Sequence, residues 1–217
     1  MTKSIARIAA ACGLAFSFSV FALTPALACK GPKTLLSDDF REIDESWGVE
    51  GDSVTVDEGR VVIKPDANTM YKLLYSGTEL ENMDYCVTVR MPNNTPDDTR
   101  GSMAGMVFWA QDYSNLFAFE ISVDGRVALE RLSKGKWTNV LDWRKVDGVN
   151  VGPSSKNTLG VTASGNTLTL SVNDAKVGTI KATHPDGAGQ IGLIGQSEKG
   201  KRNAWKFLSL KVTSVAP

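Results

Sequence analysis

The chain has 217 residues, with 24 basic and 24 acidic side chains and a single histidine. No basic patch or stripe interrupts this balance, which argues against nucleic acid as a partner. Residues 29–217 suffice for one domain with a sizeable core, and no linker or low-complexity tract divides them. We therefore predict a single domain over 29–217.

The first 28 residues have the features of a secretory signal peptide. Lys3 and Arg7 form a short basic region, residues 8–23 are almost wholly apolar, and the Ala-Leu-Ala run at 26–28 supplies small residues before a cleavage point. An uncleaved membrane anchor is the alternative, but the apolar run is short for a spanning helix. Cleavage predicts a periplasmic or secreted protein with 22 basic and 24 acidic residues and no transmembrane segment in the mature chain.

Cleavage would leave two cysteines, Cys29 and Cys86. In an oxidising compartment such a pair favours a disulfide, which would tie the N-terminal arm to the strand around Cys86. The alternatives are a lipid anchor on Cys29, two free thiols, or Cys86 as a small buried hydrophobe. Ala26 stands where lipoprotein processing favours leucine or a similar residue, which weakens the lipid anchor.

Short alternating apolar runs, separated by turn residues, follow one another along the rest of the chain and predict β-strands. No stretch has a convincing helical period with caps. The predicted strands are one around Leu35 and Leu36, then 53–56, 60–65, 70–76, 85–91, 103–110, 116–123, 126–132, 137–143, 157–163, 167–172, 176–181, 189–196 and 204–212.

The stretch 103–132 predicts a meander of three strands. Its second turn, Asp124-Gly125, is a strong hairpin signal because both residues tolerate positive φ. Side chains of the middle strand alternate between two faces. The face predicted to be buried carries Phe117, Phe119, Ile121 and Val123. The face predicted to meet water or a ligand carries Leu116, Ala118, Glu120 and Ser122.

So many short strands at a spacing of about ten residues are typical of an all-β sandwich or barrel. Two curved antiparallel sheets packed as a jelly roll are the form that this number of strands favours.

Five motifs follow one another along the chain: SDDF at 37–40, GMVFWAQDYSNLFAFEI at 105–121, DGRVALERL at 124–132, GNTLTLSVND at 165–174 and GQIGL at 189–193. Their order resembles the concanavalin A-like lectin/glucanase superfamily. More narrowly, it is similar to bacterial exported jelly-roll domains called 3-keto-disaccharide hydrolase-like or laminin-G-like. The resemblance implies a concanavalin A-like jelly-roll sandwich, a fold that hosts lectins, glycosidases and inert modules alike.

One departure from this resemblance concerns catalysis. The β-glucanases of the superfamily carry three acids at alternating positions on one strand, whereas the comparable strand here offers Glu120 alone. Ser122 takes the next position on that face, and Asp124 belongs to the turn. A retaining glycosidase needs a second carboxylate about 5 Å from the first. A hydrolase would therefore need an acid from a neighbouring strand or loop.

We predict an exported, lectin-like jelly roll that binds glycan or polysaccharide on its concave face without catalysis and without a cofactor. The alternatives are a glycoside hydrolase of the 3-keto-disaccharide hydrolase-like type and an envelope structural or interaction module. Sugar sites need aromatic planes for ring faces and planar polar groups for hydroxyls. The candidate ligand-binding residues are Trp109, Gln111, Asp112, Glu120, Arg131, Trp137 and Trp143.

Each candidate also has a structural interpretation. Tryptophans of β-sandwiches are commonly core residues, although Trp137 and Trp143, six apart on one predicted strand, share a face. Asp112 falls in a tight turn, where it would cap backbone groups. Glu120 and Arg131 would form a cross-strand ion pair if they faced each other. No spacing marks a metal site; a structural calcium ion is compatible with the acids but is not indicated.

Overall fold

The computed structural model describes residues 29–49, 51–93 and 101–215, so the predicted signal peptide at 1–28 lies outside the described residues. Within them no helix is long and apolar enough to cross a membrane. The described residues form 14 strands and one 3-10 helix. These are β1 (Thr34–Asp38), η1 (Glu45–Trp47), β2 (Val54–Val56), β3 (Val61–Ile63), β4 (Met70–Leu80), β5 (Met83–Arg90), β6 (Met103–Asp112), β7 (Asn115–Ser122), β8 (Arg126–Ser133), β9 (Lys136–Lys145), β10 (Lys156–Ser164), β11 (Thr167–Val172), β12 (Ala175–Lys181), β13 (Gly189–Gln196) and β14 (Trp205–Thr213).

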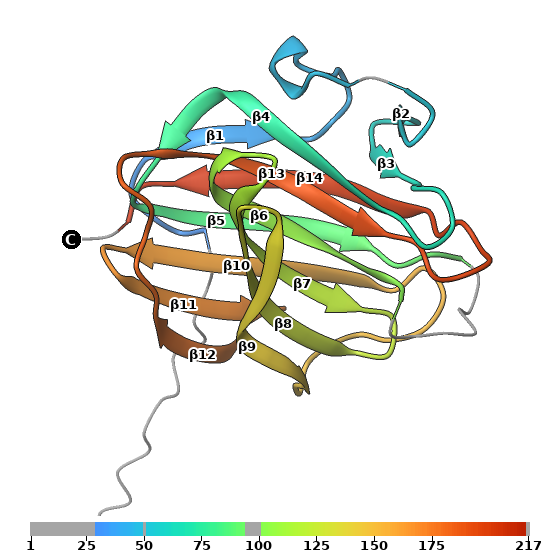
Figure 1. Cartoon of the computed structure of the whole chain (residues 1–217). Coiled ribbons are helices and arrows are strands. Elements are labelled where there is room, and N and C mark those ends of the chain that lie inside the picture. Colours follow the sequence, from blue (N-terminus) through green and yellow to red (C-terminus); the bar gives the residue numbers. More distant parts are fainter. Residues whose placement is uncertain (1–28, 50, 94–100, 216–217) are drawn as a thin grey trace, which may run out of the picture.

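The strands form two antiparallel sheets that pack face to face (Figure 1). The larger sheet has eight strands in the order β12-β11-β10-β5-β14-β3-β2, with β1 also paired to β14. The smaller sheet has six, in the order β4-β13-β6-β7-β8-β9. This confirms the predicted all-β sandwich of two antiparallel sheets.

The core between the sheets confirms the predicted phase of β7. Phe117, Phe119 and Ile121 are buried in it, and Val123 packs against it. Every second side chain of a strand points to the same face, so the apolar alternation alone fixes which side of β7 is inside.

Tight turns set the register of the hairpins. Between β8 and β9, Lys134 and Gly135 both have positive φ, 51° and 76°. Positive φ at both central residues is the geometry of a type I′ turn, whose twist matches that of paired strands. The predicted Asp-Gly hairpin between β7 and β8 is also confirmed: Gly125 has φ 83° and donates to the Ser122 carbonyl at 3.0 Å.

The six-stranded sheet is strongly curved. Lys72 lies on one edge strand, β4, and Trp137 on the other, β9, yet Lys72 Nζ is 6.0 Å from the centroid of the Trp137 ring. In a flat sheet these edges would be about 24 Å apart, given roughly 4.8 Å per strand. The outer face is therefore concave, and these two side chains meet across it. Burial there lowers the pKa of Lys72.

Side chains fill the middle of this concave face, so the prediction that the Glu120 face of β7 is open is wrong. Leu116, Ala118, Glu120 and Ser122 are each at most 2% exposed. The curvature brings side chains of separate strands over one another, which removes this face from water. A second apolar cluster results, made of Leu74, Val107, Ala110, Leu116, Ala118, Leu132 and Ile194, with Met70 and Trp137 packed against it.

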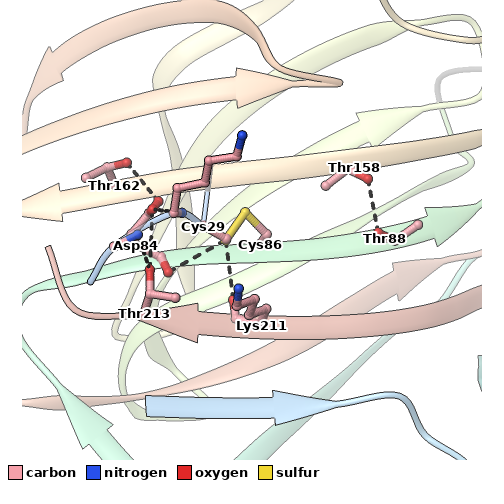
Figure 2. The surroundings of a disulfide bond; sticks show 10 residues. Cys29, Asp84, Cys86, Thr88, Thr158, Thr162, Lys211 and Thr213 are labelled. Atoms are coloured by element: carbon pink, nitrogen blue, oxygen red, sulfur yellow. Dashed lines mark hydrogen bonds between the residues drawn. A yellow bond between two sulfur atoms is a disulfide. The ribbon is translucent and has the colours of Figure 1, made fainter. Parts of the chain in front are cut away.

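On the outer face of the larger sheet, the predicted disulfide between Cys29 and Cys86 is present (Figure 2). The two Cα atoms are 5.9 Å apart. Asp84, two residues before Cys86, accepts hydrogen bonds from Lys30 N at 3.1 Å and Thr162 Oγ1 at 3.0 Å. The N-terminal arm is thereby tied to β5 both covalently and by hydrogen bonds.

Candidate ligand-binding site

A cavity of about 170 Å³, here called the rim pocket, lies where β7 begins and β8 ends. Pro185, from the loop between β12 and β13, completes its wall. Two of the predicted site residues, Gln111 and Arg131, come together in it. Its lining residues are Gln111, Asn115, Leu116, Phe117, Arg131, Leu132, Ser133 and Pro185.

Arg131 is an exposed cation over an aromatic floor. In the register of β7 and β8 it lies opposite Phe117, and its guanidinium carbon is 5.4 Å from the centroid of that ring. This cation–π contact holds the guanidinium against the pocket. Gln111, also exposed, donates from Nε2 to the Ala188 carbonyl at 3.0 Å. The pocket therefore combines an apolar floor with two positioned planar polar groups.

Hydrogen bonds of the Asn115 side chain hold the β6–β7 turn that forms one wall of the pocket. Asn115 Nδ2 donates to both carboxylate oxygens of Asp112, at 3.0 and 2.9 Å, while its Oδ1 accepts from Lys134 N at 3.0 Å. The Asn115 side chain, together with the backbone N–H of Ser114, lowers the pKa of Asp112. Asp112 thus caps the β6–β7 turn, and Asn115 joins that turn to the β8–β9 turn.

The structure separates the predicted tryptophans. Trp109 lies in the core with no exposed surface, and its Nε1 donates to the Glu81 carbonyl at 2.7 Å. Its ring meets Phe117 edge-on at 5.4 Å, so it supports the floor of the rim pocket from behind. Half-buried Trp137 lies opposite Leu132, a pocket residue. Trp143, also on β9, is half-buried as well. Two register shifts in the β8–β9 pairing interrupt the strict alternation from which Trp137 and Trp143 were predicted to share a face.

Sequence reasoning missed Tyr113 as a site candidate. It is 54% exposed and belongs to the turn that also carries Asn115. The sequence did contain a signal for this residue, namely an aromatic side chain inside a tight turn. Turns lie at the surface, so a large side chain there is expected to be exposed.

Glu120 lies on the concave face next to another acid. It is fully buried, and neither carboxylate oxygen receives a hydrogen bond from a donor in the described residues. Burial, followed by the charge and proximity of Glu130 on β8, raises its pKa well above the ordinary value. The two carboxyl groups can hydrogen-bond only when one of them is protonated. The Glu120–Arg131 ion pair that would form if the two residues faced each other is absent, because the register sets Glu120 opposite Ala128 and Arg131 opposite Phe117.

Replacing Glu120 by glutamine is expected to stabilise the protein in a pH-dependent way. Because the folded-state pKa lies above the unfolded value of 4.5, this carboxyl favours folding below that pH, and the contribution is lost as the pH rises through the folded pKa. Glu120→Gln should gain about 1–3 kcal/mol at pH 8 and little at pH 4, as expected when a buried ionisable group is replaced by a neutral amide. Urea unfolding from pH 4 to pH 8 measures this.

A matched control is Glu79→Gln, at an exposed glutamate of β4, which should leave the pH profile of the wild type unchanged. Equal stability of wild type and Glu120→Gln at pH 8 would contradict the burial of an unpartnered carboxyl.

Metal-ligand side chains converge at one place in the described residues, at Cys29, Asp84 and Cys86. The two sulfurs there are bonded to each other, so they do not offer thiolate ligands. Two neighbouring acids of the kind that bind calcium, Asp38 and Asp39, have other partners: Asp38 accepts from Phe40 N and Trp47 Nε1, and Asp39 pairs with Arg41.

Neither a scan against protein-family models nor a search of curated proteins finds a match. Solved structures do match. The carbohydrate binding module CBM66 from Bacillus subtilis aligns at a TM-score of 0.55 and 15% identity, over 71% of this chain and 86% of that one. A Bacillus licheniformis β-glucanase aligns at 0.59 and 11%, over 84% and 99%. A lichenase from a mouse hindgut metagenome aligns at 0.57 and 11%, over 83% and 99%.

This is a concanavalin A-like jelly-roll fold. The likeness agrees with the fold that the motifs imply and, at these identities, concerns the fold alone. The six-stranded sheet supplies the concave face, and the rim pocket lies at the ends of its strands β7 and β8.

Proposed function

We propose that the protein is an exported, lectin-like jelly roll that binds a glycan at the rim pocket, where β7 begins and β8 ends, without catalysis. The observation that carries the proposal is the pocket itself, which Arg131 and Gln111 line together with the apolar side chains of Leu116, Phe117 and Leu132. Sugar rings present apolar faces together with hydroxyl groups, and such a floor with planar polar groups matches both.

Size and surroundings support this proposal. A cavity of about 150 Å³ holds one benzene ring, so about 170 Å³ suits a single six-membered ring rather than a long oligosaccharide. Exposed Tyr113 lies two residues before the pocket residue Asn115, and half-buried Trp137 lies opposite the pocket residue Leu132. Both provide aromatic surface for further sugar units of a glycan. The structural neighbours include a carbohydrate-binding module.

Glycoside hydrolysis is the second candidate, and the Glu120–Glu130 pair favours it. Two carboxyl groups on adjacent strands, one with a raised pKa, are the components of acid–base catalysis. Against it, Glu120 has no exposed surface, so its carboxyl group is out of reach of a glycosidic bond in solution. Should any turnover be found, its loss in Glu120→Gln would favour hydrolysis over binding alone.

Calorimetric titration with a panel of neutral and acidic oligosaccharides tests glycan binding. For a shallow site we expect a Kd of about 0.1–1 mM, roughly −4 to −5.5 kcal/mol. Arg131→Ala should weaken binding about tenfold or more, since hydrogen bonds from a charged donor are lost. Arg41→Ala is the matched control, because Arg41 is a well-exposed arginine paired with Asp39 outside the pocket.

Absence of binding to every oligosaccharide at millimolar concentration would overturn the proposed function. It would favour the remaining alternative, an envelope module without a small ligand, with which the covered middle of the concave face is compatible.

A further inference from the structure

Arg131 has an unbalanced charge in the rim pocket. None of the ion pairs among the described residues includes it, and its close contact is with the uncharged ring of Phe117. Several other arginines have carboxylate or carbonyl partners, as Arg126 has with Asp124 at 2.8 Å and Arg144 with the Val177 carbonyl at 2.8 Å. Arg131 is instead held in place by packing, with its donors directed to solvent or to a ligand.

No acidic side chain lines the pocket to compensate this charge. The nearest acid along β6 is Asp112, whose carboxylate is engaged by Ser114 N at 2.6 Å and by Asn115 Nδ2. Two lysines add positive charge near the pocket residue Ser133: Lys134 lies in the β8–β9 turn, and Lys136 begins β9. A neutral sugar would leave the guanidinium without a counter-charge, whereas an anionic one would supply it.

We propose that the rim pocket selects a sugar unit that carries a carboxylate, a uronate. This inference rests on the proposed glycan-binding function and names its ligand class. The planar guanidinium fork matches a carboxylate in two parallel hydrogen bonds, and the apolar lining residues Leu116, Phe117 and Leu132 offer contacts to the ring. The cavity has room for one such ring.

The test compares trisaccharides of galacturonate, mannuronate and glucuronate with their methyl esters and with neutral and sulfated trisaccharides, by calorimetry on the wild-type protein. We expect at least one uronate to bind about tenfold or more tighter than its methyl ester, which keeps the ring but removes the charge. The advantage should shrink at about 0.5 M salt, because screening weakens exposed charge pairs.

Substitutions of Arg131 test whether this residue causes the preference for the acid over the ester. Arg131→Gln should abolish the preference for acid over ester, and Arg131→Lys, which keeps the charge but not the fork, should retain part of it. Arg41→Gln should change neither. Circular dichroism of each variant shows that it is folded.

The outcomes separate this inference from the proposed function. Equal affinity for acids and esters, or tighter binding of the sulfated trisaccharide, would overturn the uronate assignment and leave glycan binding in place. Failure of every trisaccharide to bind would overturn both.

Discussion

Phe119→Asp is expected to abolish folding of the domain. Phe119 is fully buried in the core and lies between Met106 on β6 and Leu129 on β8 in the strand register. Removing a buried phenylalanine costs about 3–5 kcal/mol, and an unpaired buried carboxylate adds several more. Together these match the roughly 5–15 kcal/mol by which a domain is stable. Far-UV circular dichroism and thermal melting of the variant measure the result.

Tyr113→Asp serves as the control, since it makes the same change of an aromatic residue to aspartate within the same meander. Tyr113 is 54% exposed, so its variant should stay within about 1 kcal/mol of the wild type. A Phe119→Asp protein that melts like the wild type would mean that β7 is displaced by one residue, with Glu120 directed into the core.

The sequence predicted the fold because local alternation and long-range packing agree in the central meander. Phe117 and Phe119 recur with period two, and Asp124-Gly125 supplies the turn, so strand phase and hairpin pairing follow from neighbouring residues. The disulfide followed from the count of cysteines left after the predicted cleavage.

The candidate site was predicted only in part, because it depends on register and curvature. Gln111 and Arg131 meet in the rim pocket, but Pro185 reaches it from a loop far along the chain, which no local pattern marks. Trp109 has φ 51° beside a bulge in the β6–β7 pairing, and its side chain lies in the core instead of near Gln111 at the surface. The cover over Glu120 arises from the bending of a whole sheet, a property that the sequence of one strand does not contain.

Removing the disulfide is expected to lower the free energy of unfolding by about 4 kcal/mol in the chain-entropy treatment, since Cys29 and Cys86 are 57 residues apart. With an m-value of about 2–3 kcal/mol/M, the urea midpoint should fall by roughly 1–2 M. The measurement compares the wild type with the double variant Cys29→Ala/Cys86→Ala. Reductant should bring the wild type to the midpoint of the double variant and leave the double variant itself unchanged.

This loss should arise in the unfolded chain and not in the native structure. Lys30 N still donates to Asp84 at 3.1 Å and Gly31 N to Thr213 Oγ1 at 3.0 Å, so these contacts hold the arm on β5 and β14 without the covalent bond. The reduced protein should therefore keep its native circular dichroism below the transition while it unfolds at lower urea. Two alkylated thiols on the untreated protein, or a midpoint that reductant does not move, would contradict the disulfide, and a diacylglycerol mass on Cys29 would support the lipid anchor in its place.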